Sequence, residues 1–382
     1  MKKFKSQNIF ICHRDFINKS YYREGGGDHL RKKLFQSSLN LDISHGSFER
    51  NNFFNFTISY SKNYKKKIFF EKKFSKKIKL LKYIIIFLVF IKFLKENNIK
   101  PKVILAIDPV SSLLGILIKF IFGTKNIFHI TDYSDRRFSN IILELIYKLI
   151  FSFSLFNSDY ITSPSQKLIR KLKKNIYYIP NIPQIKYDIK FKRKNLILFL
   201  SPKIDSGINI ENVINCGILL KKFKNYKILV TGYFQDPIIK KNFFRLIKKN
   251  QLNSIIFHKN FIKNKQKLKN ILNQSIVGIT SYNITNIHNY YNYADSLKIR
   301  QYCEFGIIVL TEGLTPLAKS VDKKFGFIYK NSFDMTQKLN LILSNKKLQI
   351  FFQKNSKNWS ILQDKKNNLE KLKKKLKLFF DN

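Results

Sequence analysis

The residues best suited to chemistry lie in the stretch 295–312, which reads as a helix followed directly by a buried strand. Lys298 falls in the first turn of that helix, and Gly306 supplies the left-handed geometry that commonly ends a helix. Ile307 to Leu310 is a short apolar run, typical of a parallel strand covered on both faces. Because the free N–H groups of a helix start and a lysine ammonium attract the same negative charge, this stretch predicts an anion site at the carboxyl edge of a parallel sheet.

A second set of polar residues follows the apolar run 127–130 in the first half of the chain. His129 lies in that run, and Asp132 and Asp135 come after it. At the carboxyl end of a strand, His129 and Asp132 are candidate catalytic residues, and Asp135 is a candidate for binding an acceptor. The alternatives are a packed strand histidine and two aspartates that cap the following helix.

A glycine-rich loop follows the first predicted strand, 8–12. Gly26 and Gly27 let a backbone approach a ligand closely, and Asp28 and His29 directly after them could bind an acceptor or supply its general base. The Gly-x-Gly-x-x-Gly pattern of dinucleotide sites is absent. A plain flexible turn is the alternative interpretation of this loop.

Alternating strand and helix patterns must position all of these residues. Apolar runs predict strands at 8–12, 54–60, 103–107, 127–130, 160–162, 196–200, 227–232, 255–258, 275–280, 307–310 and 325–329. Helical patterns fall at 76–94, 111–121, 141–156 and 209–223, and in a basic tail at 347–380. Two successive series of this kind predict an α/β protein with two Rossmann-like, doubly wound parallel-sheet domains that face a cleft.

A polar, basic stretch near the middle of the chain sets the expected domain boundaries. We expect an N-terminal domain over 1–183, a linker over 184–194, a second domain over 195–345 and a helical tail over 346–382. No internal repeat is detectable.

Composition narrows the class of protein. The 382 residues are 44% hydrophobic, which is enough for substantial cores and too much for a disordered chain. A net charge of +48 would suit a nucleic-acid-binding protein, but the lysines are spread along the whole chain and the favoured residue types have A/T-rich codons. Cys12, Cys216 and Cys303 lack CxxC spacing, so neither a zinc site nor a disulfide framework is expected.

Targeting signals are also missing from the sequence. The N-terminus has no apolar signal-peptide region, and the apolar run 83–91 is too short to span a bilayer. We therefore expect a cytoplasmic protein. The helix predicted at 76–94 is either a core helix or a peripheral contact with the anionic inner face of a membrane.

The ordered motifs resemble those of GT-B-fold glycosyltransferases, in particular the large retaining family 4, also called group 1. The family pattern L-K-x-x-E-Y-x-A-x-G-x-P-V-V corresponds to the stretch that Leu297 opens, and 159–165 and 179–181 match its "D-x-I-T-x-S" and "I-P-N" stretches. The resemblance covers nearly the whole chain. It implies transfer of a sugar from a nucleotide-diphosphate donor to a glycan, lipid-linked or polysaccharide acceptor, with retention and without a metal ion or cofactor. It also implies that the tail crosses back onto the first domain.

The resemblance assigns roles to residues in the second half of the chain. Lys203 and Lys298 correspond to contacts with the donor diphosphate, and Ser206 stands about where the family usually has a second lysine. Gln301 aligns with a glutamate that binds the donor ribose. Tyr293 stands where the first glutamate of the family's pair would be, so donor-sugar recognition differs at this position. In the same family a histidine near the place of His129 contacts the donor sugar or diphosphate.

Two other classes of protein stay open. One is a catalytically degenerate GT-B partner protein, which Tyr293 and Gln301 favour. The other is a basic nucleic-acid-binding protein, which would bind DNA or RNA in a salt-dependent manner. Glu304 and Glu312 share the mutual spacing of the family's glutamate pair, but their position relative to Gly306 excludes them from that role.

Overall fold

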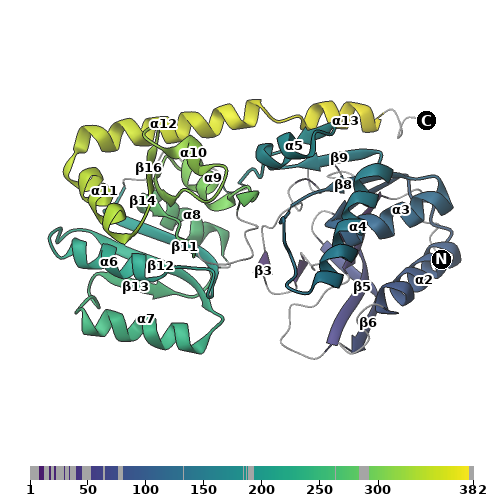
Figure 1. Ribbon diagram of the computed structural model, residues 1–382, viewed down its shortest axis with the longest axis horizontal. Helices are drawn as coiled ribbons and strands as arrows, with labels where there is room; N and C mark the ends of the chain where they lie inside the picture. The colour runs from purple at the N-terminus through teal and green to yellow at the C-terminus, as the bar shows by residue number, and fades with distance from the viewer. Residues whose placement is uncertain are drawn as a thin grey trace. The chain divides into compact units, whose positions relative to one another are not determined.

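The computed structural model describes residues 8–12, 17–18, 21–22, 30, 34, 40–44, 53–62, 65–75, 81–131, 133–183, 185, 187, 193–262, 264–283 and 292–377. The chain divides into two compact units (Figure 1). Unit 1 comprises Met1–Pro180 together with Asn367–Asn382, and unit 2 comprises Asn181–Lys366. Each unit is an α/β domain built on a largely or wholly parallel sheet.

Unit 1 contains a sheet of eight strands in the order β10-β9-β8-β7-β1-β4-β5-β6. The strands are β1 (Asn8–Cys12), β4 (Asn40–Ser44), β5 (Phe53–Lys62), β6 (Lys65–Ser75), β7 (Val103–Ile107), β8 (Lys125–His129), β9 (Tyr160–Ser163) and β10 (Ile176–Tyr178). Neighbouring strands from β10 to β4 pair in parallel, whereas β5 pairs antiparallel with β4 and with β6. A separate antiparallel pair is formed by β2 (Ile17–Asn18) and β3 (Tyr21–Tyr22).

The antiparallel edge of this sheet differs from the sequence prediction. The strand predicted at 54–60 is present as β5, but it belongs to a hairpin rather than to the parallel series. Its partner β6 carries lysines at Lys65, Lys66, Lys67, Lys72 and Lys73. Such charged residues are depleted in strands but tolerated on an edge strand, which is why the sequence did not indicate β6.

Helices cover both faces of the parallel part of the unit 1 sheet. They are α2 (Leu81–Glu96), α3 (Pro109–Phe122), α4 (Ile141–Asn157), α5 (Gln166–Leu172) and α13 (Leu369–Lys377). Ile9 and Ile11 of β1 pack on one face with residues of α2 and α3. On the other face Val103 and Leu105 of β7 pack with Leu372 of α13, so the end of the chain completes the core of unit 1.

Unit 2 contains six parallel strands in the order β13-β12-β11-β14-β15-β16. They are β11 (Leu196–Ile204), β12 (Lys227–Phe234), β13 (Ile256–Lys259), β14 (Ser275–Ile279), β15 (Ile308–Glu312) and β16 (Gly326–Tyr329). The helices are α6 (Glu211–Leu220), α7 (Pro237–Lys249), α8 (Lys265–Gln274), α9 (Leu297–Glu304), α10 (Ala318–Val321), α11 (Ser332–Ser344) and α12 (Lys346–Lys365). Buried residues of the central strands pack against helices on both faces.

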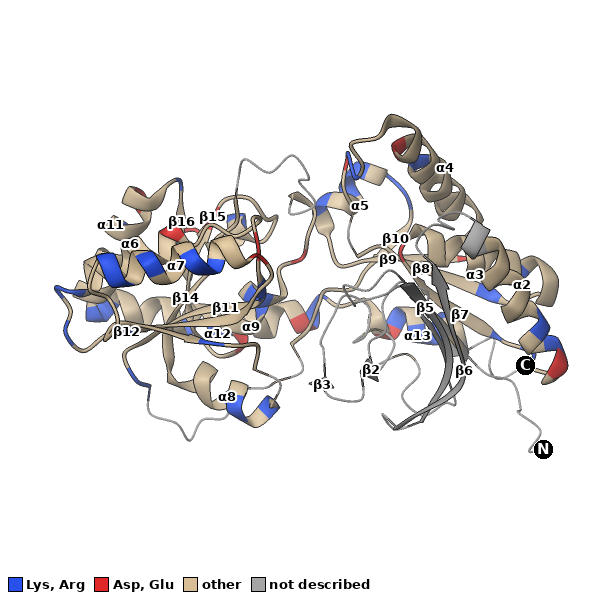
Figure 2. Cartoon of the chain, turned by 90° about the horizontal axis from the view of Figure 1, so that it is seen from below, with Lys and Arg blue, Asp and Glu red and all other residues tan. Residues whose placement is uncertain are grey.

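The prediction of two doubly wound α/β domains is confirmed. The tail predicted as one segment over 346–382 is divided in the structure, with α12 in unit 2 and α13 in unit 1. Within the described helices of both units, Lys and Arg residues are distributed over several helices rather than gathered in one stripe (Figure 2). No helix among the described residues is both long enough and apolar enough to cross a bilayer.

Candidate functional site

The direction in which the chain builds the unit 2 sheet reverses between β11 and β14. From β11 the chain proceeds outward through β12 to β13, and from β14 it proceeds in the other direction through β15 to β16. The loops that follow β11 and β14 are joined, because the Asn283 N–H donates to the Gly207 carbonyl at 2.9 Å and the Asn283 Nδ2 donates to the Ser206 carbonyl at 3.2 Å. The carboxyl ends of strands at such a reversal are where open α/β sheets bind ligands.

Helix α9 begins at this edge and presents Lys298 in its first turn. Ser296 caps the helix by accepting a hydrogen bond from the Ile299 N–H at 3.4 Å. The Lys298 Nζ lies 4.9 Å from the centroid of the Tyr282 ring and 6.0 Å from that of Phe199. Burial lowers the pKa of Lys298 to about 8, although the nearby charges of Glu312 and Asp205 act in the opposite direction. Lys298 is therefore a partly buried cation at the start of a helix.

Glu312 is the last residue of β15 and is buried close to Lys298. Its Oε2 accepts a hydrogen bond from the Tyr329 hydroxyl at 3.1 Å, whereas its Oε1 is buried and has no hydrogen-bond partner among the described residues. Burial raises the pKa of Glu312 to about 7, against the effect of hydrogen bonds and of the Lys298 charge. A buried acid beside a partly buried base, both with pKa values shifted toward neutrality, marks a candidate functional site.

Lys203 and Ser206 lie on the same edge, at the end of β11 and in the loop after it. The Lys203 Nζ is 2.7 Å from the Asp205 Oδ2 and 3.4 Å from the Gln235 Oε1, and the lysine side chain is partly exposed. Ser206 is exposed. Asp205 influences both Lys203 and Lys298, so the two predicted lysines belong to one cluster of charges. Asp205 was missed in the sequence, because β11 continues to Ile204, beyond the end of the strand predicted at 196–200.

The other predicted donor-binding residues lie on or just before α9. Gln301 is buried one turn after Lys298, and its Nε2 has no hydrogen-bond partner within the described part of the chain. Tyr293 is also buried, and Leu297 is partly buried at the first position of the helix. Residues three apart on a helix lie on one side, so Lys298 and Gln301 can face the same ligand.

A buried ion pair that the sequence did not indicate braces the start of α9. The Arg300 Nε lies 2.7 Å from the Asp295 Oδ1 and 2.8 Å from the Oδ2, and the Asn181 N–H donates to the same carboxylate at 2.7 Å. Burial raises the pKa of Asp295, while Arg300 and the Asn181 hydrogen bond lower it. Arg300 also lies over the ring of Trp359 in α12 at 5.4 Å. Asp295 and Arg300 therefore fix the start of α9, and with it the position of Lys298, because both are held by further contacts.

Few of the predicted site residues of unit 1 are described. His129 ends β8, is fully buried, and its Nδ1 lies 2.7 Å from the Thr162 Oγ1 of β9. Asp135 is exposed and forms an ion pair with Lys171. The remaining predicted residues, Asp132, Gly26, Gly27, Asp28 and His29, lie outside the described residues.

Asp108 is a further candidate in unit 1, at the reversal of chain direction between β1 and β7. It directly follows β7 and has a φ of 76°, which is unusual for a residue other than glycine. Its carboxylate accepts hydrogen bonds from the N–H and the hydroxyl of Ser111, at 2.9 and 3.1 Å, and so caps α3. The Asp-Pro pair at the end of an apolar strand is the sequence signal for this position. Among the described residues of both units, no group of three His, Cys, Asp or Glu side chains could hold a metal ion.

Comparison with known proteins identifies the fold. No protein-family model matches the chain, and no curated protein is significantly similar to it in sequence. Solved structures are similar. Sucrose-phosphate synthase from Thermosynechococcus elongatus gives a TM-score of 0.68 at 12% identity, covering 99% of this chain and 98% of that one.

Two structures determined with nucleoside diphosphates are also similar. The catalytic domain of starch synthase IV from Arabidopsis thaliana, bound to ADP and acarbose, gives a TM-score of 0.59 at 11% identity, covering 97% of this chain and 99% of that one. HepE of Anabaena in complex with UDP gives a TM-score of 0.61 at 11% identity, covering 78% of this chain and 82% of that one. These proteins are GT-B glycosyltransferases, so the expected GT-B fold class is confirmed. At such low identity the likeness establishes the fold, and the activity must be argued from the site.

Proposed function

We propose that the protein is a glycosyltransferase that takes a sugar from a nucleotide-diphosphate donor bound by unit 2. The observation that carries this proposal is Lys298, a partly buried lysine at the start of α9 whose pKa is lowered by burial and which forms no ion pair with a described residue. A cation in that setting is costly unless it binds an anion. The carboxyl edge between β11 and β14 is the usual place for a nucleotide in such a sheet, and two similar structures were solved with UDP or ADP.

Sugar transfer requires little covalent help from the enzyme. Negative charge builds up on the leaving diphosphate, and the enzyme must stabilise that charge while it holds the acceptor hydroxyl in line. In the proposed mechanism Lys298, Lys203 and the N–H groups of α9 supply this stabilisation, and no metal ion takes part. Glu312 and Asp205 keep Lys298 charged near neutral pH until the diphosphate binds.

In this proposal the buried residues around Lys298 determine which donor is bound. The Nε2 of Gln301 is a buried donor that can bond a ribose hydroxyl or the sugar. Unit 1 would bind the acceptor, which we propose to be a glycan, a lipid-linked glycan or a polysaccharide. We also propose that transfer proceeds with retention, which the anomeric configuration of the product, followed by NMR, would test.

Nucleotide binding is the first test. Thermal-shift measurements with UDP, GDP, ADP and CMP should show stabilisation by at least one nucleoside diphosphate, and Lys298→Met should abolish it. Lys338→Met is a matched control, because Lys338 is another partly buried lysine of unit 2, paired with Asp334 at 2.8 Å on α11. This control variant should retain the shift. Stabilisation that persists in Lys298→Met, or no stabilisation by any nucleoside diphosphate, would contradict the proposed donor site.

A second candidate function is a GT-B protein that binds nucleotide without turnover. The replacement of the family's glutamates by Tyr293 and Gln301 favours it, because neither side chain carries the negative charge of a glutamate. Release of UDP or GDP from a panel of nucleotide sugars separates the two functions. Release that survives EDTA supports the metal-independent enzyme, and binding without any release supports the non-catalytic protein.

A further inference from the structure

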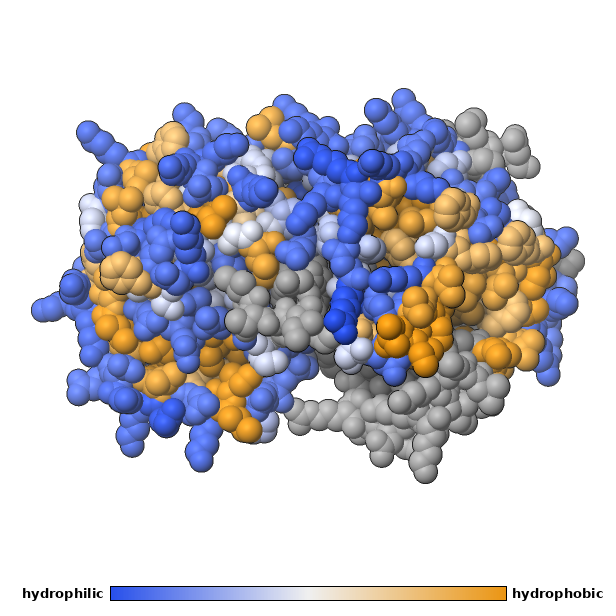
Figure 3. All heavy atoms as spheres, in the orientation of Figure 1, coloured by the Kyte–Doolittle hydropathy of each residue, from blue (hydrophilic) through white to orange (hydrophobic). Residues whose placement is uncertain are grey.

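Helix α4 of unit 1 is apolar on two opposite sides. Its inner side packs into the unit through Tyr147 and Phe151, with Glu144 and Ser154 also buried. Its outer side exposes six large apolar side chains: Ile141, Ile142, Leu145, Leu149, Phe153 and Phe156. Apolar atoms gather over this part of unit 1 in Figure 3.

The outer side of α4 is unlike that of an ordinary surface helix. Leu149 is 70% exposed and Phe156 is 72% exposed, and spacings of four residues align Ile141, Leu145 and Leu149 in one row. A helix on the surface of a globular protein normally directs polar residues outward, and a helix that is apolar all round is normally buried. A contiguous exposed patch of this kind indicates an interaction surface. We call these six residues the outer face of α4.

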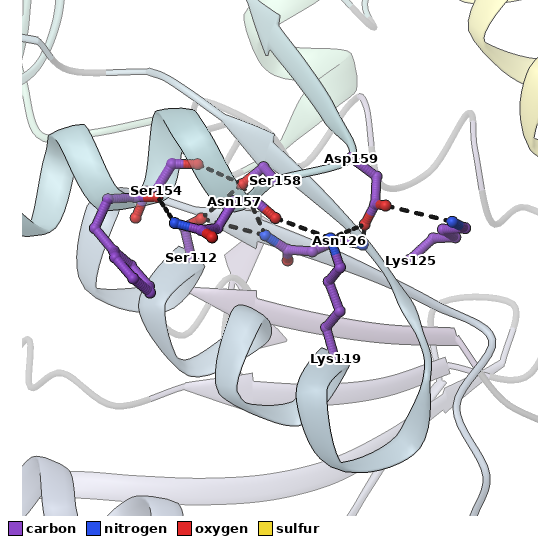
Figure 4. A network of polar contacts seen from close by, with 9 residues as sticks. Ser112, Lys119, Lys125, Asn126, Ser154, Asn157, Ser158 and Asp159 are labelled. Atoms are coloured by element: carbon purple, nitrogen blue, oxygen red, sulfur yellow. Dashed lines mark hydrogen bonds and ion pairs between the residues drawn. The ribbon is translucent and has the colours of Figure 1, made fainter.

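Polar contacts hold α4 in this orientation. At its C-terminal end the Lys119 Nζ donates to the Asn157 carbonyl at 2.9 Å, and the Asn126 Nδ2 donates to the Ser158 hydroxyl at 3.0 Å (Figure 4). Asp159 pairs with Lys119 at 3.0 Å and accepts the Asn126 N–H at 2.9 Å. At the other end the Asn140 side chain caps the helix. Because both ends are fixed, α4 cannot roll to bury its outer face against unit 1.

Basic residues flank the outer face at both ends. Arg136 is exposed just before the helix, and the Lys174 Nζ lies 3.7 Å from the centroid of the Phe156 ring beyond its other end. The neighbouring Arg137 is exposed too, but its guanidinium lies over the ring of Tyr147 on the inner side at 5.2 Å. The only acidic residue of α4, Glu144, is buried and accepts hydrogen bonds from backbone N–H groups before the helix. The surface therefore offers apolar side chains framed by cations, on a protein with a net charge of +48.

From this geometry we propose that the outer face of α4 docks on the surface of an anionic lipid membrane. The helix lies in the interface with its apolar side chains among the acyl chains and the flanking cations at the lipid head groups. Its buried inner side keeps it from crossing the bilayer. An acidic protein surface would match the cations but not the six apolar side chains. This docking does not depend on nucleotide binding by unit 2, so either proposal can fail without the other.

Vesicle binding tests the proposal. The full chain should co-sediment with vesicles of phosphatidylcholine and phosphatidylglycerol, bind pure phosphatidylcholine more weakly, and lose affinity as salt rises from about 0.1 to about 0.5 M. The double variant Leu149→Ser with Phe156→Ser should reduce partitioning by about tenfold or more. The matched control is Ile238→Ser with Phe333→Ser, since both of these unit 2 residues are 70% exposed, and it should bind like the wild type.

Fluorescence provides a second measurement that does not remove the apolar surface. Leu149→Trp should be quenched by brominated lipid in anionic vesicles, whereas Ile238→Trp should add no quenching to that of the native Trp359. Equal quenching of the two variants, or equal binding of the two serine variants, would overturn the proposal. So would a wild-type dimer without lipid that becomes monomeric in the α4 variant, because the face would then be an interface between copies. Nucleotide thermal shifts of the same variants report on unit 2 separately.

Discussion

Replacing Lys298 by methionine should make unit 2 more stable while it abolishes nucleoside-diphosphate binding. Burial disfavours the charged form of Lys298 and lowers its pKa to about 8. Folding at neutral pH must therefore bring a charged ammonium into a site that disfavours it. Methionine fills a similar space without the charge, so the variant avoids this cost.

The size of the effect follows from the pKa. A lowering from 10.5 to about 8 corresponds to about 3 kcal/mol at about 1.4 kcal/mol per pH unit. Below pH 8 the lysine is protonated in both the folded and the unfolded chain, so the folded state carries the full cost. Between pH 8 and 10.5 the folded protein loses the proton first and the cost declines. The advantage of Lys298→Met should thus be about 3 kcal/mol at pH 7 and below about 1 kcal/mol at pH 10.

Urea unfolding followed by tryptophan fluorescence measures the difference in unfolding free energy between the wild type and Lys298→Met, and it reports on unit 2. Trp359 is the only tryptophan of the chain and packs on Phe325 within unit 2, with ring centroids 5.3 Å apart. The control Lys338→Met removes an ion pair with Asp334 and a hydrogen bond to the Ile328 carbonyl, so it should give no gain in stability.

Two results would refute the reasoning. If Lys298→Met is no more stable than the wild type at pH 7, Lys298 does not carry a burial cost. If the variant is more stable by the same amount at pH 7 and pH 10, the gain comes from packing and not from the charge. Saturation with the best nucleoside diphosphate should meanwhile narrow the stability gap between the proteins, because only the wild type binds it.

Three other substitutions test the surroundings of Lys298. The pKa of Glu312 is raised to about 7, so the wild type should lose about 3 kcal/mol of stability as pH rises from about 4.5 to 7, and Glu312→Gln should lack this loss in urea titrations at pH 5 and pH 8. Tyr302→Phe removes a buried hydroxyl that accepts from the Leu200 N–H at 3.0 Å and should cost about 2 kcal/mol in the same assay. Asp295→Asn leaves Arg300 buried without its carboxylate, so it should cost about 3–5 kcal/mol and lower the melting temperature.

The helix and strand at 295–312 could be predicted because local rules determine them. Gly306 has a φ of +60° at the end of α9, as a glycine C-cap requires, and the apolar run after it forms a strand buried on both faces. The antiparallel hairpin of β5 and β6 could not be predicted in the same way. Strand β6 is recognised only by its pairing with β5, and pairing between strands is not a local property of the sequence.

The charge cluster around Lys298 could not be predicted either, because its members are distant in the sequence. The sequence puts Lys298 in the first turn of a helix, but Asp205 and Glu312 reach it from the ends of two different strands. Their approach depends on the strand order and on the register of β14 with β15, where Ile279 lies opposite Leu310. The same is true of the Asp295 and Arg300 pair, whose bond to Asn181 joins positions 114 residues apart. Spacing along the chain does not reveal such contacts.

The polar side chains at the two ends of α9 differ in whether they have hydrogen-bond partners. At the C-terminal end Glu304 is buried, but its carboxylate is bonded to the Lys357 Nζ at 3.0 Å and to the Ser360 hydroxyl at 2.9 Å. At the N-terminal end Lys298 forms no ion pair with a described residue, and Glu312 and Gln301 each keep a buried polar atom without a described partner.

The C-terminal end of α9 thus contacts polar groups that are fully hydrogen-bonded, whereas the N-terminal end lies beside buried polar atoms without described partners. The buried Oε1 of Glu312 and the buried Nε2 of Gln301 lower stability as long as they have no partner. Such groups are retained where a ligand supplies the missing partners. The contrast predicts that a bound nucleoside diphosphate will slow hydrogen exchange at the start of α9 and leave the end at Glu304 unchanged. Equal protection at both ends, or protection at the C-terminal end alone, would place the ligand elsewhere.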